Sequence, residues 1–323
     1  MYMKFPINYI YVWWLTSFHY SPEEPDLING KGYGTAAAFV TAVIWGLSFV
    51  AARMVLTTLT PVLLATVRFI IASLIFLPVV LGGLRNGSRP TNGDLKEMAL
   101  LGFMSISIYF WLQYTGVQYA GAGVSALLVV GLIPILTGFA SSFILKESFS
   151  PQKVTGAVLG LVGVSLITIP GLLGASVDWG FYFGVACLLG NAVCWSLYTA
   201  LSRRIVKRTG KPLMVTAYVT LAGTLALLPM SLTSNWGLVA SIQQAQWVSV
   251  LYLAVVCSGG GYFLWNYALS KTEAVNTAVW LYLEPVAAFI GEAALFGIIP
   301  GGLTLLGGAG IIMGALLTNA AKK

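Results

Sequence analysis

Two glutamates stand in an otherwise apolar stretch, residues 281–295, which reads LYLEPVAAFIGEAAL. Glu284 and Glu292 are eight positions apart, a rotation of about 80° beyond two helical turns, so both can border one interior sector. A carboxylate in such a setting can bind an amine or take up a proton. Pro285 removes a backbone donor and frees the carbonyl of Leu281, which adds a polar patch beside the first acid. The alternative is that the glutamates only tie helices together.

The composition explains why these acids stand out. Hydrophobic residues make up 58% of the 323 positions and charged residues 8%, against about 25% charged in an ordinary soluble domain. Beyond residue 33 the chain divides into apolar runs of about 20 residues, the length that crosses a hydrocarbon core of about 30 Å. We therefore expect an all-α membrane protein with ten transmembrane helices, at 34–56, 61–82, 95–117, 121–145, 152–170, 178–202, 212–233, 246–269, 274–297 and 302–319.

Basic residues fall on alternate connections between these predicted helices. The connections that lack Lys and Arg are 57–60, 118–120, 171–177, 234–245 and 298–301. The opposite face carries Lys31, Arg85, Arg89, Lys96, Lys146, Lys153, Arg203, Arg204, Lys207, Arg208, Lys211, Lys271, Lys322 and Lys323. Because basic loops stay in the cytoplasm, both termini are predicted to be cytoplasmic. The net charge of +7 then reflects topology and contact with lipid, and no nucleic-acid partner is expected.

The two halves of the sequence match when the chain is displaced by 151 positions. The matches are Pro61 with Pro212, Pro78 with Pro229, Val124 with Val275, Pro134 with Pro285, Gly156 with Gly307 and Gly163 with Gly314. The chain is thus interpreted as two five-helix repeats. Because five is an odd number, the second repeat must enter the membrane in the opposite sense, and the repeats are inverted.

This repeat sets the expected domain boundaries. The first repeat covers 34–170 and the second 178–319, with a linker at 171–177 and a cytoplasmic tail at 320–323. Residues 1–33 are expected to form an interfacial or disordered arm, because the aromatic run FPINYIYVWWLTSF at 5–18 is too short to span a membrane.

Four segments resemble a known family. They are VIWGLSFVAARMVL at 43–56, ATVRFIIASLIFLP at 65–78, the long stretch from Gln113 to Leu166, and WNYALSKTEAVNTAVWLYLEPVAAF at 265–289. Together they resemble the EamA-type transporters of the drug/metabolite transporter superfamily. The resemblance covers 34–319 and implies a ten-helix secondary transporter with a cavity lined by helices 1, 3, 4, 6, 8 and 9. One departure concerns Glu147, which fits the family's pattern, whereas its repeat counterpart at 298 is isoleucine. Glu147 is therefore interpreted as a structural residue at a cytoplasmic helix end.

Aromatic and amide side chains supply the candidate binding set around Glu284. On helix 6, Asn191, Trp195 and Tyr198 have i, i+4, i+7 spacing and share one face. The full set is Glu284, Trp45, Ser48, Tyr109, Gln113, Asn191, Trp195, Tyr198, Tyr262, Asn266 and Trp280. Ring faces with a few amides suit a zwitterionic or cationic solute. The alternative is that these aromatics only pack helices or mark the membrane interface.

Further residues bear on mechanism. Glu284 and Glu292 are the candidates for proton coupling, and Pro134 and Pro285 for helix breaks that act as hinges at a midplane site. Packing kinks are the alternative for both prolines. Arg68, also inside a span, can pair with an acid such as Glu292 or extend to the outer surface. Glycines on helices 5 and 10 predict packing ridges, with a homodimer contact left open.

The chemistry of enzymes has little support in the sequence. There is one histidine among 323 residues, with no HExxH motif and no nucleophile beside a base. We therefore expect no catalytic residues, no metal and no cofactor. The sequence and the resemblance predict a secondary transporter in a bacterial inner (plasma) membrane. It would export small amphipathic metabolites, such as amino acids or related amines, by alternating access. The alternative is a membrane sensor or scaffold that keeps the fold without transport, with its cavity filled by its own aromatic side chains.

Overall fold

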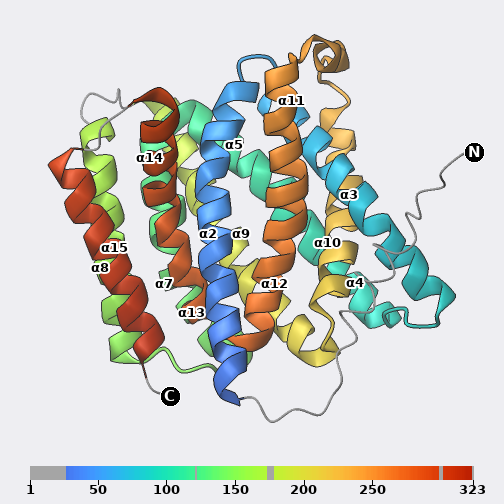
Figure 1. The fold of residues 1–323 in the computed structure, drawn as a ribbon, viewed down its shortest axis with the longest axis horizontal. Helices are drawn as coiled ribbons and strands as arrows, with labels where there is room; N and C mark the ends of the chain where they lie inside the picture. The colour runs from blue at the N-terminus through green and yellow to red at the C-terminus, as the bar shows by residue number, and fades with distance from the viewer. Residues whose placement is uncertain (1–26, 121, 173–177, 298–300, 322–323) are drawn as a thin grey trace, which may run out of the picture.

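The protein folds into a bundle of helices that run side by side (Figure 1). The computed structural model describes residues 27–120, 122–172, 178–297 and 301–321. All regular elements in these ranges are helical, so the all-α prediction is confirmed for them. Of the interfacial or disordered arm predicted at 1–33, residues 1–26 lie outside the described residues.

The helices of the first half follow the predicted apolar runs. They are α2 Leu27–Val55, α3 Pro61–Arg85, α4 Asn92–Gly102, η1 Phe103–Ile108, α5 Tyr109–Ala120, α6 Ala122–Ser125, η2 Ala126–Val130, α7 Gly131–Leu145 and α8 Pro151–Leu172. Helix α2 begins seven residues before the predicted span at 34, so part of the stretch assigned to the arm is helical.

The second half follows the same plan. Its elements are α9 Trp179–Thr209, α10 Pro212–Leu227, η3 Pro229–Ser231, η4 Trp236–Ser241, α11 Gln244–Leu251, η5 Tyr252–Gly261, α12 Tyr262–Lys271, α13 Ala274–Ala278, η6 Val279–Tyr282, α14 Leu283–Phe296 and α15 Gly302–Ala320.

Nine helical segments of the described chain are long and apolar enough to cross a membrane. Several consist of consecutive elements, such as 244–271, which joins α11, η5 and α12. Each coincides with one of the ten predicted spans. The remaining prediction, 152–170, corresponds to α8, whose apolar stretch Pro151–Ile167 is shorter than the others. The composition and these helices identify an integral membrane protein.

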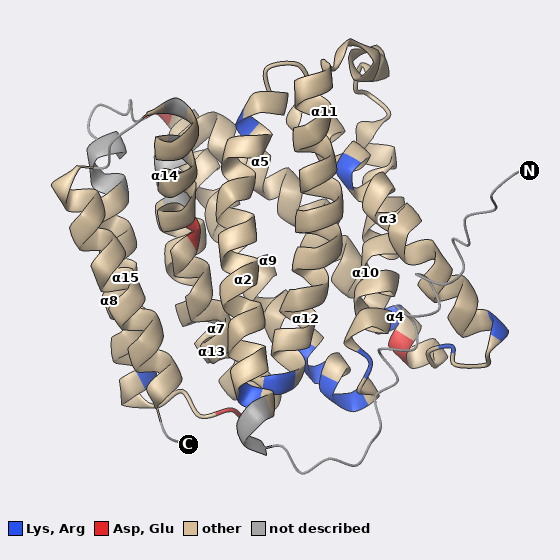
Figure 2. Cartoon of the chain, in the orientation of Figure 1, with Lys and Arg blue, Asp and Glu red and all other residues tan. Residues whose placement is uncertain are grey.

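The charged residues are distributed unevenly along the bundle. Lys and Arg gather at one end, where α3 finishes and α4 and α10 begin (Figure 2). We call this the basic end. It is the face on which the sequence places all but a few of the basic residues.

Irregular helical turns occur at matching places in the two halves. The π-helical segment η1, displaced by 151 residues, falls within the π-helical η5. The π-helical η2, which precedes Pro134, partly overlaps after the same displacement with η6, a tighter 3₁₀ segment that precedes Pro285. A proline interrupts the normal hydrogen-bond ladder on its N-terminal side, and wide or tight turns are two ways to accommodate that loss.

Helices α8 and α15 cross at glycines, and each of these glycines lies against a glycine of the other helix. A Cβ added at Gly156 would lie 2.7 Å from the Gly314 carbonyl oxygen, and one at Gly163 would lie 2.6 Å from that of Gly307. The reverse additions, at Gly314 and Gly307, would each lie 2.5 Å from the oxygen of the same partner. Only glycine permits so close an approach of two backbones. The predicted glycine ridges are therefore occupied by packing within the chain.

Candidate functional site

Six aromatic rings from four stretches of the chain meet at the centre of the bundle. Trp195 on α9 lies in the middle, with ring centroids 5.0 Å from Tyr109 and Tyr198 and 5.3 Å from Trp45. Tyr262 and Trp265 on α12 follow at 5.8 and 5.9 Å. We call these six residues the aromatic cluster. The edge-on and tilted arrangements are the ones that aromatic pairs prefer.

Most polar atoms around the cluster are used to hold helices together. Asn266 donates to the Tyr198 hydroxyl at 3.2 Å and to Thr216 at 2.9 Å, and accepts a hydrogen bond from Ser202. It therefore links α12 with α9 and α10. The Tyr262 hydroxyl donates to the backbone carbonyl of Ser105 at 3.3 Å. Both residues belong to the predicted binding set, and the structure engages both in contacts between helices.

Trp45 is fixed by the irregular segment η5. Its Nε1 donates to the Cys257 carbonyl at 3.1 Å. A Cβ at Gly261 would lie 2.5 Å from that nitrogen, so this glycine leaves room for the indole. A π-helical turn widens the helix and frees backbone carbonyls for such contacts. The predicted residue Ser48 donates to the Trp45 carbonyl at 2.5 Å and thus contacts its own helix.

Other polar atoms beside the cluster lack a partner. The Nε1 atoms of Trp195 and Trp265, Oδ1 of Asn191 and Oε1 of Gln113 are buried and make no hydrogen bond to any described residue. The other amide atom of Asn191 donates to the Tyr109 carbonyl at 2.7 Å, which fixes the side chain. Buried polar atoms are normally satisfied, so these four are candidates to meet water or a bound solute.

Glu284 faces the same interior. The residue is 9% exposed, and its backbone presses against α2, because a Cβ at Gly46 would lie 2.5 Å from the Glu284 carbonyl oxygen. Its carboxylate forms no hydrogen bond or ion pair with the residues that the structure describes. The buried acid therefore lies in the interior of the bundle and is not exposed to lipid.

Arg68 is a buried positive charge near the aromatic cluster, because the neighbouring Phe69 packs against Tyr262. The residue is 7% exposed, and its Nε donates to the Ser258 hydroxyl at 2.8 Å. Its guanidinium carbon lies 5.2 Å from the ring centroid of Phe69 and 5.3 Å from that of Phe110. Arg68 therefore stays inside the bundle and does not extend to the outer surface, whereas its predicted pairing with Glu292 involves a side chain outside the described part of the structure.

One predicted site residue, Trp280, is not brought to the cluster. Trp280 lies on η6 and stacks edge-on with Phe39 at 5.5 Å. In a regular α-helix it would share a face with Glu284, four residues on. The 3₁₀ segment turns about 20° more per residue than an α-helix and rotates Trp280 away. The side chain of Glu292 is outside the described part of the structure.

Buried ion pairs close the basic end, and sequence analysis missed them. Glu147, just beyond α7, pairs with Arg203 of α9 and accepts from the backbone nitrogen of Ala274 at 2.9 Å. Lys153 at the start of α8 pairs with Glu273. We call these two pairs the basic-end latch, because they join the two halves of the sequence. The partners are 56 and 120 residues apart, so no local pattern predicts them.

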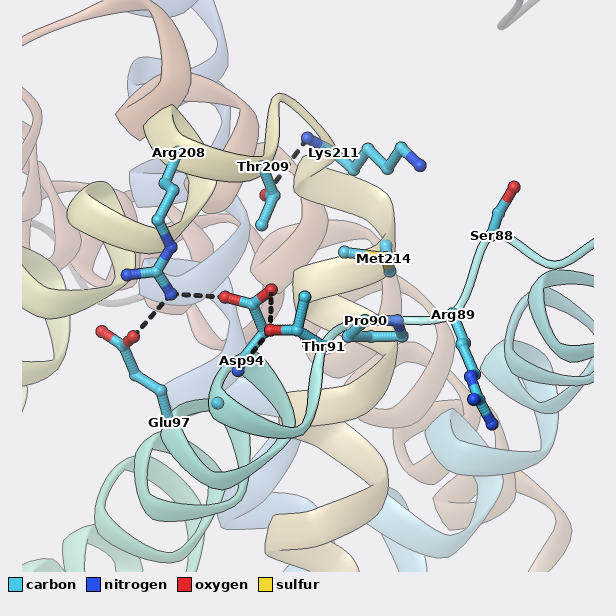
Figure 3. A pocket seen from close by; sticks show the side chains of 11 residues that line it. Ser88, Arg89, Pro90, Thr91, Asp94, Glu97, Arg208, Thr209, Lys211 and Met214 are labelled. Carbon is cyan, nitrogen blue, oxygen red and sulfur yellow. Dashed lines mark hydrogen bonds and ion pairs between the residues drawn. The ribbon is translucent and has the colours of Figure 1, made fainter.

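A separate charged recess of about 600 Å³ lies at the same end. Figure 3 shows Arg208 between Asp94 and Glu97, with Thr91 beside Asp94. The Arg208 side chain is 48% exposed, and ion pairs in such positions contribute little to stability. Within the described residues no group of three His, Cys, Asp or Glu side chains could hold a metal ion.

Comparisons with known proteins agree with this architecture. The EamA-like transporter family matches twice, at residues 32–169 and 182–320. A "Probable terminal-alkyne amino-acid exporter" of Streptantibioticus cattleyicolor is 28% identical, over 88% of this chain and 92% of the relative. A "Probable amino-acid metabolite efflux pump" of Salmonella typhimurium is 26% identical, over 87% and 93%.

The fold is also found in a solved structure. One crystal structure superposes with a TM-score of 0.73 at 21% sequence identity, covering 88% of this chain and 95% of the other. The two family matches lie in the two halves that the sequence repeat defines, and the resemblance noted in the sequence is confirmed. The chain therefore belongs to the EamA-like transporter family and is an integral membrane transporter, not an enzyme.

Proposed function

We propose that the protein is a secondary exporter of amino acids or related amines, and that it binds them at the aromatic cluster between Glu284 and Arg68. One observation carries the proposal: these two opposite charges are buried inside the bundle, and among the described residues neither has an ion-pair partner. Unpaired charges in a membrane protein are costly and are retained where a substrate or ion uses them.

The roles follow from the chemistry of each group. The Glu284 carboxylate receives the ammonium group of the substrate. The faces of Trp45 and Trp195 contribute cation–π attraction, which is worth about 0.5–2 kcal/mol per contact. Arg68 keeps its two terminal nitrogens for a carboxylate, because Nε is already bonded to Ser258. The free atoms of Gln113 and Asn191 add hydrogen bonds. Two relatives named for amino-acid export support this substrate class.

The proposed architecture is ten transmembrane helices in two inverted repeats, 34–170 and 178–319, joined by the linker 171–177. Contacts between repeat counterparts support it. Ser73 hydrogen-bonds to Thr224, its counterpart 151 residues on, at 2.8 Å, and the Tyr282 hydroxyl donates to the carbonyl of its counterpart Gly131 at 3.1 Å. Residues that meet their own counterparts, like the reciprocal glycines of α8 and α15, are expected about a two-fold axis.

The basic end is proposed to face the cytoplasm of a bacterial cell, with both termini on that side and the bundle in the inner membrane. The structure then represents a state closed to the cytoplasm by the basic-end latch. Alternating access requires the latch to open while the opposite end closes. Pro134 and Pro285, beside the irregular segments η2 and η6, are the proposed hinges.

Proton coupling is a separate part of the proposal. Glu284 is the proposed carrier, because a carboxylate that binds an ammonium group can exchange that group for a proton. Glu292, about two helical turns nearer the opposite end in sequence, is the second candidate. A membrane potential of 100 mV supplies about 2.3 kcal/mol per charge moved, so one coupled proton is enough to drive export.

A sensor or scaffold without transport is the second candidate function. The observation that favours it is the ring-on-ring packing of the aromatic cluster, which fills space that a substrate would need. A transporter has to separate some of these rings when it binds its substrate, whereas a scaffold does not.

Uptake into proteoliposomes separates these functions. The panel consists of radiolabelled amino acids, polyamines and aromatic cations, each tested with and without an imposed pH gradient. Saturable uptake of an amine is expected, and dependence on the gradient would identify proton coupling. Absence of uptake across the panel, with folding and orientation of the protein verified, would contradict the transport proposal and support the scaffold.

A further inference from the structure

A second recess opens on the side of the bundle at the basic end. Its volume is about 540 Å³, and its wall includes Lys31, Thr35 and Phe39 of α2, Trp280 of η6 and Asn319 of α15. None of the six rings of the aromatic cluster lines it. The proposed transport site does not use this recess.

Two polar atoms of the recess wall lack partners. Trp280 is 8% exposed, and its Nε1 donor makes no hydrogen bond within the described chain. Oδ1 of Asn319 is buried and similarly without a donor. The Asn319 amide nitrogen donates to the carbonyls of Asn276 at 3.2 Å and Ala315 at 3.0 Å, which fixes the side chain. A fixed donor and a fixed acceptor without partners indicate a polar ligand.

The charged residues that line the recess indicate the charge of that ligand. Lys31 is exposed, and no described residue forms an ion pair with it. Among the described residues, those that line the wall include no Asp or Glu. This recess therefore favours an anion, in contrast to the interior beside Glu284.

The recess changes from charged to apolar along α2. Phe39 lies eight residues beyond Lys31, about 12 Å deeper along the helix axis. Its ring is partly exposed and packs edge-on against Trp280. A charge at headgroup depth above an aromatic, apolar floor fits an amphipathic molecule that lies in the membrane.

We propose that this recess binds an anionic phospholipid, with its phosphate at Lys31 and an acyl chain along Phe39. Trp280 Nε1 donates to an oxygen of the headgroup or glycerol ester, and the Asn319 oxygen accepts from a headgroup hydroxyl. Basic pockets between membrane helices on the cytoplasmic side are suited to such headgroups. The inference goes beyond the transport proposal, because it needs neither a particular substrate nor transport.

Native mass spectrometry of the purified protein tests the proposal with two lipids, phosphatidylglycerol and phosphatidylcholine. The wild type is expected to bind phosphatidylglycerol more tightly. Lys31→Gln removes the cation and is expected to weaken phosphatidylglycerol binding about fivefold, the effect of one basic residue near the membrane surface. Trp280→Phe keeps an aromatic ring, removes the donor and is expected to weaken binding of both lipids.

Two controls make the outcome decisive. Lys96→Gln removes an exposed cation of α4 at the same end, outside the recess, and is expected to leave lipid binding unchanged. Millimolar inorganic phosphate is expected not to displace the lipid. Equal binding of the two lipids, normal binding by Lys31→Gln, or displacement by free phosphate would each overturn the proposal. A thermal unfolding scan of every variant verifies that a loss of binding does not reflect a loss of fold.

Discussion

Two regions of the protein contain buried charged side chains. They differ in whether a buried charged side chain forms an ion pair with another described residue. In the basic-end latch, Glu147 pairs with Arg203 and Lys153 with Glu273. In the central site, Glu284 and Arg68 are buried to a similar degree, yet no ion-pair partner for either exists among the described residues. Removing one member of a buried pair leaves an uncompensated charge, whereas an unpaired charge has no partner to lose. The comparison distinguishes charged residues that stabilise one conformation of the protein from charged residues that are available to bind a ligand.

The largest effect is expected from breaking the latch on one side. Glu147→Gln leaves the Arg203 guanidinium buried beside carbonyls of Leu269 and Thr272, without its carboxylate. We expect the protein to lose about 3–5 kcal/mol of stability. Chemical unfolding in detergent measures this loss. The double variant Glu147→Gln/Arg203→Gln, which removes both charges, is expected to recover part of it; equal or greater loss would show that the pair does not act as a unit.

The central site is expected to respond in the opposite way. Glu284→Gln removes an unpaired charge, so stability should be unchanged or slightly raised. Amino-acid uptake should fall about 10- to 100-fold, because an ammonium–carboxylate contact is worth about 1.5–3 kcal/mol. Concentration-dependent uptake and an unfolding curve on the same preparation measure both quantities. A large loss of stability with this variant would place Glu284 with the latch as a structural residue.

A smaller effect is expected from the rings. Trp195→Leu removes the central ring of the aromatic cluster and the cation–π attraction that it offers. The half-saturating concentration of a transported amine should rise about 2- to 30-fold, which corresponds to about 0.5–2 kcal/mol. Phe183→Leu is the control, because that ring is 50% exposed on the outer face of α9. Equal effects of both substitutions would contradict a binding role for the cluster.

The smallest effect is expected at the exposed charges. Arg204 pairs with Glu97 at 2.8 Å, but its side chain is 47% exposed. Arg204→Gln should change the free energy of unfolding by less than about 1 kcal/mol and leave uptake unchanged. A loss as large as that of Glu147→Gln would show that exposure does not separate the latch from the surface pairs.

Several elements of this account could be predicted from sequence, because they depend on local periodicity. Apolar runs located the membrane helices, and helical spacing placed Asn191, Trp195 and Tyr198 on one face, which the contacts of α9 with Tyr109 reproduce. The repeat matches of glycine anticipated ridges, although not that α8 and α15 use them against each other. These features follow from the geometry of single helices.

The remaining features depend on how distant helices meet. Phe69, Phe110 and Ser258, which contact Arg68, belong to three separate helical segments, so the sequence could suggest only an acidic partner or extension to the outer surface. The ion pairs of the basic-end latch could not be predicted for the same reason, because their partners are far apart in the sequence. Trp280 was assigned to the binding site as one of the aromatic side chains near Glu284 in sequence, and in the structure, where it belongs to the 3₁₀ segment η6, it lines another recess.

Substrate competition tests most directly the central claim that the unpaired Glu284 carboxylate binds the ammonium group of a transported amino acid. Uptake of the best-transported labelled amino acid of the panel is measured with the unlabelled amino acid, or its N-acetyl derivative, as competitor. Wild-type protein should be inhibited far more strongly by the free amine, and Glu284→Gln should lose most of that preference. Equal preference in the two proteins would contradict the claim.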